Sequence, residues 1–237
     1  MKSIFHDVFY QPLYNGLILF IHTFPWLDAG FAIIFFTLIV KFILFPLSRK
    51  ATVAGIEMKK IEPELTKIRE KYKTDKQEQA KRTWELYKNK KVSPFGSILP
   101  ILIQLPIIFA LYFIFLKSGL PAVDETLKYS FIPLPEKINM NFLGFIDITG
   151  KSWILAIAAG VSSFFQMRVS APPISTDGKR SFQSDLARSM NIQMRYFFPV
   201  IVLFISYSIS GVVALYWFTS NIFTLVQEKL IRRKFKV

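Results

Sequence analysis

The chain has 237 residues with a formal net charge of +14, and 52% of its residues are hydrophobic. It contains no cysteine, which excludes disulfides, thiolate metal sites, a cysteine redox pair and a lipid-bearing N-terminal cysteine. Its first residues lack the charged, apolar and small-residue regions of a signal peptide, so we expect them to stay in the mature protein.

The apolar residues are gathered into blocks, and a helix needs about 20 mostly apolar residues to cross a bilayer. We therefore predict one all-α polytopic membrane domain over residues 1–237. Residues 9–26 are apolar but are interrupted by Asn15, His22 and Pro25, which favours a helix lying in the outer interface. The five transmembrane helices are expected at residues 29–47, 95–116, 152–168, 195–209 and 212–229.

Basic residues lie mostly on one side of this arrangement. Twenty-four lysines and arginines fall in residues 48–94, 168–195 and 229–237, whereas five fall in the segments on the other side. By the positive-inside rule the basic side is cytoplasmic, which puts the N-terminus outside and the C-terminus in the cytoplasm. One steeply tilted helix over 196–226 is the alternative to the last two spans, and it would place the basic tail outside.

The segment at residues 51–92 is highly charged and predicts a cytoplasmic helical hairpin. A break at its middle places Thr74 and Gln77 to form a capping box for the second helix. The hairpin is either a solvated element that sets topology or a mobile cap at the cytoplasmic face. A thin apolar seam at helical spacing is expected to join its helices, made of Ile61, Leu65, Ile68 and Tyr72 in the first and Ala80, Trp84 and Tyr87 in the second.

Three other segments connect or follow the spans. Residues 118–151 contain three prolines and are expected to form an extracytoplasmic loop. Residues 169–194 are typical of a flexible cytoplasmic loop, and residues 230–237 form a basic tail. Each basic residue near an anionic bilayer surface contributes about 1 kcal/mol of binding free energy, so we expect the tail to contact anionic lipids.

Lys41 lies inside the apolar run of residues 30–47, and no carboxylate shares that run. A charge at bilayer depth costs at least about 2.5–3.5 kcal/mol, so such a residue is a candidate for function. The structural alternative is a snorkelling lysine whose ammonium reaches the interface. Leu47 ends the run six residues later, roughly 9 Å along a helix, so the side chain could reach that far.

Residues 94–106 contain prolines at 94, 100 and 106, with Gly96 and Gln104 between them, and this spacing resembles the YidC/Oxa/Alb family of membrane protein insertases. The segment from Thr37 to Lys41, followed by Phe-Pro-Leu at 45–47, resembles the first core span of that family. The charged hairpin and the segment from Ser210 to Asn221 resemble its cytoplasmic hairpin and last span. The resemblance covers about residues 9–231.

The resemblance implies five core helices around a hydrophilic groove that is closed to the outside and open to cytoplasm and lipid. It places Lys41, Thr37, Gln104, Gln166 and Trp217 at this substrate groove. The usual family residue at position 41 is arginine, which stays protonated, whereas lysine can lose its proton in a dry site. The chain also lacks the extra first span and large extracytoplasmic domain of many members, so it resembles a minimal core.

The function implied is that of a membrane insertase and chaperone in the bacterial inner membrane, acting on nascent membrane proteins. We expect no enzymatic activity and no cofactor or metal, because insertion breaks no bond and no catalytic set is visible. The resemblance extends to contacts with the ribosome and the Sec translocon, and no DNA partner is expected. The alternative is a small transporter or channel for an anionic solute, which predicts an internal repeat that the sequence does not show.

Overall fold

The computed structural model describes residues 4–93, 99–116, 122–170, 189 and 192–235. These residues are mostly helical, which confirms the all-α class, with one short β ladder beside the helices. The chain divides into two compact units, Met1–Ile43 with Gln104–Val226, and Leu44–Ile103 with Gln227–Val237. The start of the expected second span and most of the expected loop at 169–194 lie outside the described residues.

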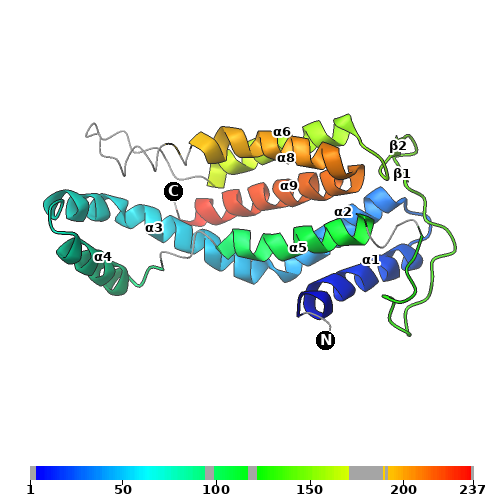
Figure 1. Ribbon diagram of the computed structural model, residues 1–237, viewed down its shortest axis with the longest axis horizontal. Helices are drawn as coiled ribbons and strands as arrows, with labels where there is room; N and C mark the ends of the chain where they lie inside the picture. Colours follow the sequence, from blue (N-terminus) through cyan, green and yellow to red (C-terminus); the bar gives the residue numbers. More distant parts are fainter. Residues whose placement is uncertain (1–3, 94–98, 117–121, 171–188, 190–191, 236–237) are drawn as a thin grey trace. The chain divides into compact units, whose positions relative to one another are not determined.

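The first unit contains most of the elements drawn in Figure 1. Helix α5 enters it at Gln104, and helix α9 leaves it at Val226. In chain order the elements are η1 (His6–Tyr10), α1 (Gln11–Thr23), α2 (Ala29–Ile43), α5 (Leu99–Leu116), β1 (Asn141–Phe142), β2 (Ile146–Asp147), α6 (Trp153–Ser170), η3 (Gln193–Phe197), α8 (Phe198–Ile209) and α9 (Gly211–Lys234).

Helix α6 has the inverted polarity of a membrane helix, with large apolar side chains outside and small residues inside. Its backbone approaches α8 so closely that a Cβ added at Gly160 would lie 2.9 Å from Leu203 Cβ. Small residues at such interfaces let membrane helices pack by van der Waals contact. The exposed residues are Trp153, Ile154, Ile157, Val161 and Phe165, and the buried ones include Ala156, Ala159, Ser162 and Ser163.

The loop after α5 is fastened to helix α1 by buried polar contacts. Asn15 is only 2% exposed. Its Nδ2 donates to the Leu127 carbonyl oxygen at 2.9 Å, and its Oδ1 accepts from the Tyr129 N–H at 2.7 Å. The asparagine read from the sequence as an interruption is therefore the attachment point of a segment more than 100 residues away.

Carbonyl oxygens of the same loop accept hydrogen bonds from the first N–H groups of α2 and α9. The Ala29 N–H donates to the Asn139 carbonyl oxygen at 2.8 Å, and the Gly211 N–H donates to the Gly150 carbonyl oxygen at 2.8 Å. Strands β1 and β2 pair antiparallel between these contacts. Their turn holds Leu143 at a φ of 57°, a left-handed conformation that is rare for a bulky residue, and its N–H donates to Asp28 Oδ2 at 3.1 Å.

Within the described residues, α6 is long and apolar enough to cross a bilayer by itself. Helices α2 and α3 (Phe45–Lys71) pass the same test only when they are taken together as one broken span. The expected span at 29–47 is thus divided at Leu44, and Pro46 occupies the first turn of α3, where a missing N–H leaves no helical partner unsatisfied. The count of five spans stays a prediction.

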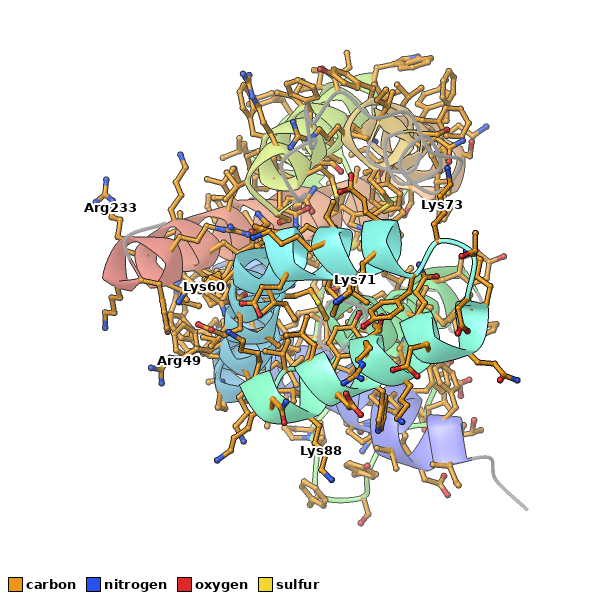
Figure 2. All side chains as sticks on the ribbon, turned by 90° about the vertical axis from the view of Figure 1, so that its left-hand side faces the viewer. Arg49, Lys60, Lys71, Lys73, Lys88 and Arg233 are labelled. Carbon is orange, nitrogen blue, oxygen red and sulfur yellow. The ribbon has the colours of Figure 1, made fainter. Side chains whose placement is uncertain are left out.

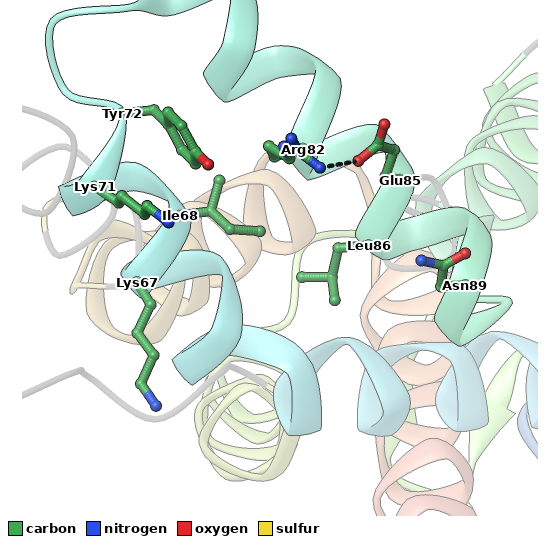
Figure 3. Close-up of a pocket in the computed structure, with 8 residues that line it drawn as sticks. All are labelled: Lys67, Ile68, Lys71, Tyr72, Arg82, Glu85, Leu86 and Asn89. Carbon is green, nitrogen blue, oxygen red and sulfur yellow. Dashed lines mark hydrogen bonds and ion pairs between the residues drawn. The ribbon is translucent and has the colours of Figure 1, made fainter.

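The second unit consists of α3, α4 (Lys76–Lys90), the first residues of α5 and the end of α9. Its apolar core contains Ile61 and Leu65 of α3 with Leu86 and Val92 from α4 and the residues after it. Figure 3 shows the pocket between the two helices, with Tyr72 and Ile68 on one side and Leu86 on the other.

Two details of the expected hairpin are wrong. The N-cap of α4 is Asp75, whose carboxylate accepts from the Glu78 N–H at 3.0 Å, and not Thr74. Trp84 and Ala80 are exposed and do not form the seam, because the core side of α4 is set by Leu86 on the opposite side of the helix. The exposed outer surface of this unit is strongly basic, as the labelled lysines and arginines in Figure 2 show.

Candidate functional site

Lys41 is placed by the last turn of α2 and is partly buried. Its Nζ donates to Gln104 Oε1 of α5 at 3.2 Å and to Thr224 Oγ1 of α9 at 3.3 Å. Both acceptors are neutral, and no carboxylate of the described residues forms an ion pair with this ammonium. Among the described residues, the positive charge of Lys41 is therefore stabilised by the dipoles of neutral amide and hydroxyl groups.

Gln104 extends these contacts further along α9. Its Nε2 donates to the Tyr216 hydroxyl oxygen at 2.6 Å, so one amide joins the ammonium to a buried phenol. Thr224 in turn donates from Oγ1 to the Ser220 carbonyl oxygen at 2.8 Å. Three helices of the first unit, α2, α5 and α9, thus meet in one hydrogen-bonded network, which we call the Lys41 network: Lys41, Gln104, Tyr216 and Thr224.

Of the five residues expected at the groove, the structure joins Lys41 and Gln104 directly. Thr37 lies one turn before Lys41 and is buried, and its hydroxyl donates to the Ile33 carbonyl oxygen at 2.6 Å. Trp217 is buried next to Tyr216 in α9. Gln166 donates from Nε2 to Ser170 Oγ of its own helix at 3.0 Å. The groove roles of these residues stay predictions.

Tyr216 and Thr224 are members of the Lys41 network that the sequence analysis did not single out. A signal was present, because Tyr216, Ser220 and Thr224 recur every four residues and so share one face of a helix. A polar stripe of this kind in an otherwise apolar span indicates a face turned toward other polar groups rather than toward lipid.

A second buried polar contact ties α9 to α6. Asn221 donates from Nδ2 to Ser162 Oγ at 3.1 Å and to the Ala159 carbonyl oxygen at 3.3 Å. Hydrogen bonds of this kind between membrane helices contribute about 0.6 kcal/mol on average, so they fix orientation more than they add stability. This contact fixes the rotation of α9 about its own axis relative to α6.

Comparison with known proteins decides the family. The family model described as 60Kd inner membrane protein matches residues 20–237. The chain belongs to this family. Its members are inner membrane proteins and the family confirms the resemblance to YidC-type insertases, which act on nascent membrane proteins and are not enzymes.

Its relatives include three proteins named membrane protein insertase YidC. The protein of Fusobacterium nucleatum is 35% identical over 207 residues, which are 87% of this chain and 87% of the relative. That of Clostridium tetani is 32% identical over 88% of this chain and 84% of its own length. That of Francisella philomiragia is 30% identical, and the match spans 87% of this chain but 33% of the longer relative.

The groups of the Lys41 network can bind polar groups of another chain by hydrogen bonds, which fits a family of insertases that break no covalent bond. An ammonium with two neutral acceptors can exchange either of them for a carboxylate or a backbone carbonyl oxygen of another chain. The described residues contain no group of three or more histidine, aspartate or glutamate side chains placed to hold a metal ion. The arrangement is suited to receiving a polar segment inside an apolar surround.

Proposed function

We propose that this insertase receives the polar, acidic segments of its substrates at the Lys41 network while their apolar helices pass into lipid. Transfer of an apolar helix into the bilayer is favourable, but each unsatisfied polar group in the hydrocarbon layer costs several kcal/mol. A hydrophilic groove open to cytoplasm and lipid would shorten the dry path that such a segment crosses. Thr37, Gln166 and Trp217 are proposed to line this groove.

The observation that carries the proposal is the pairing of Lys41 with neutral acceptors only. Its two hydrogen bonds, at 3.2 and 3.3 Å, lie at and just beyond the long end of the usual range. A bond between an ammonium and a carboxylate is shorter, about 2.7–2.9 Å, and roughly twice as strong as a neutral bond. Exchange of Gln104 or Thr224 for a substrate carboxylate would therefore be favourable.

We further propose five spans, with the N-terminus outside and the basic segments in the cytoplasm. The support is the distribution of 24 bases on one side against five on the other. In this orientation the hairpin and the tail are available to the ribosome, the Sec translocon and anionic lipid. The transporter alternative is not favoured, because each of the three relatives is named an insertase.

The absence of cysteine in the chain allows a direct test of the substrate path. Single cysteines would replace Thr224 in the network and Thr37 one turn before Lys41. Phe109 and Ile222 would be replaced as controls, since these two are large apolar side chains exposed on α5 and α9. Each variant would be cross-linked to a ribosome-stalled membrane protein. The proposal expects links from the acidic segment to positions 37 and 224; links to the control positions alone would contradict it.

A further inference from the structure

Helix α4 has one exposed face that contains basic and aromatic residues but no acid. Trp84 lies at its centre and is 65% exposed. At 100° per residue, the exposed side chains within about 60° of Trp84 define this face, which we call the Trp84 face. They are Gln77, Ala80, Lys81, Lys88 and, at the C-cap, Lys91. Figure 2 shows Lys88 projecting from α4 on the side away from α3.

The acids of α4 lie on its other side and are already paired there. Arg82 donates to Glu78 Oε1 at 2.8 Å and to Glu85 Oε2 at 3.0 Å. Figure 3 shows Arg82 and Glu85 at the pocket that faces α3. The inner side of α4 is thus neutralised within the unit, whereas Lys81, Lys88 and Lys91 have no ion-pair partner among the described residues.

We propose that the Trp84 face docks on the surface of an anionic bilayer, with the indole at the level of the headgroups and the lysines against lipid phosphates. Tryptophan is enriched at membrane interfaces because its ring is amphipathic. Amphipathic helices that lie on bilayers combine such a residue with a lysine-rich polar flank. The hairpin begins two residues after α2, so it is tethered to a membrane protein and weak contacts suffice.

The composition of the Trp84 face favours lipid over RNA. RNA-binding surfaces combine lysine with arginine, whose planar guanidinium stacks on bases and binds phosphate with two hydrogen bonds. The face contains lysines and no arginine, and the one arginine of α4, Arg82, is committed to Glu78 and Glu85 on the opposite side. Lysines act as point charges, which suits a fluid surface of headgroups without fixed geometry.

The experiment measures lipid contact by electron paramagnetic resonance on the full-length protein in nanodiscs. Single cysteines would replace Ala80 on the Trp84 face and Asn89 on the opposite side, since both are exposed and lie about 180° apart on the helix. Each would carry a nitroxide. In discs of phosphatidylglycerol we expect the label at 80 to collide severalfold more with oxygen, relative to a water-soluble nickel complex, than the label at 89. In phosphatidylcholine the difference should shrink.

Charge reversal supplies the matched control. Lys81→Glu with Lys88→Glu should abolish the difference between positions 80 and 89, and Trp84→Ala should reduce it. Lys67→Glu with Lys71→Glu makes the same change in net charge at the pocket side of α3 and should leave it intact. Equal ratios of oxygen to nickel collisions at positions 80 and 89 in anionic discs would overturn the proposal. So would a label at 80 that is shielded from the nickel complex only when ribosomal RNA is added. Lys41 variants should not change this readout, so its failure is distinguishable from failure of the proposed substrate site.

Discussion

Replacement of Lys41 by methionine should separate substrate handling from folding. The variant keeps an unbranched side chain but loses the ammonium and its bonds to Gln104 and Thr224. Those two residues retain their other hydrogen bonds, to Tyr216 and to the Ser220 carbonyl oxygen. The loss of two long bonds is offset by removal of a charge that costs at least about 2.5 kcal/mol at bilayer depth. We therefore expect a melting temperature within a few degrees of the parent protein.

The rate at which Lys41→Met inserts an acidic substrate should, in contrast, fall strongly. A hydrogen bond that involves a charged group contributes about 1.5–3 kcal/mol, which corresponds to roughly 10- to 100-fold in rate if the contact forms during crossing. Lys41→Arg should stay within about threefold of the parent, because it keeps a cation that can pair with a carboxylate. Lys41→Glu should be at least as impaired as the methionine variant, since it adds like-charge repulsion.

The assay is insertion into proteoliposomes, scored by protease protection of the translocated segment. Two substrates would be compared that differ only by aspartate or asparagine in that segment. The reasoning predicts that Lys41→Met slows the aspartate substrate and spares the asparagine substrate. If both substrates slowed equally, or if neither did, the electrostatic role of Lys41 would be refuted.

Three further predictions concern the frame around the site. Asn15→Ala leaves the Tyr129 N–H without its partner, while the Leu127 carbonyl oxygen keeps Gln11 Nε2 at 3.2 Å, and should lower the free energy of unfolding by about 1–3 kcal/mol, measured by denaturation in detergent. Gly160→Val should destabilise the protein by about 1–3 kcal/mol, because α6 and α8 meet there, whereas Gly55→Val, with open space around it, should not; equal effects in the same assay would contradict the close packing. Hydrogen bonds from the Thr149 hydroxyl and N–H lower the pKa of Asp147 below its usual 3.8. Its contribution to stability is therefore complete above pH 4 and is lost as the pH falls through the lowered pKa, so Thr149→Ala should flatten the dependence of the melting temperature on pH below 4.

The helical class and the charged hairpin could be predicted from the sequence because they depend on local patterns. Apolar blocks and 3.6-residue spacing report which segments are helical, and the spacing of Ile61 and Leu65 reports one side of a hairpin core. The same rule misplaced Trp84, because a spacing pattern does not say which of two apolar positions on a helix finds a partner. Leu86 packs against the apolar residues of α3, whereas Trp84 is exposed.

Contacts between distant segments were beyond such patterns. The partners of Asn15 lie more than 100 residues away, so its polarity was read as an interruption of an apolar stretch. The link between Gln104 and Tyr216 likewise depends on how two helices are rotated about their axes. Lys41 could be singled out because an ionised group in an apolar run is costly wherever its partners lie.

The attachment of α1 to the loop sets an order of events during synthesis. Asn15 needs the backbone groups of Leu127 and Tyr129, and 112 residues separate it from the first of these. At about 5–20 residues per second, a ribosome adds that length in roughly 5–20 seconds. For this time the asparagine must keep water as its partner, because leaving it unpaired in hydrocarbon would cost several kcal/mol. The first helix to be made is thus secured only after the hairpin and α5 have been synthesised, and until then its asparagine has to stay hydrated.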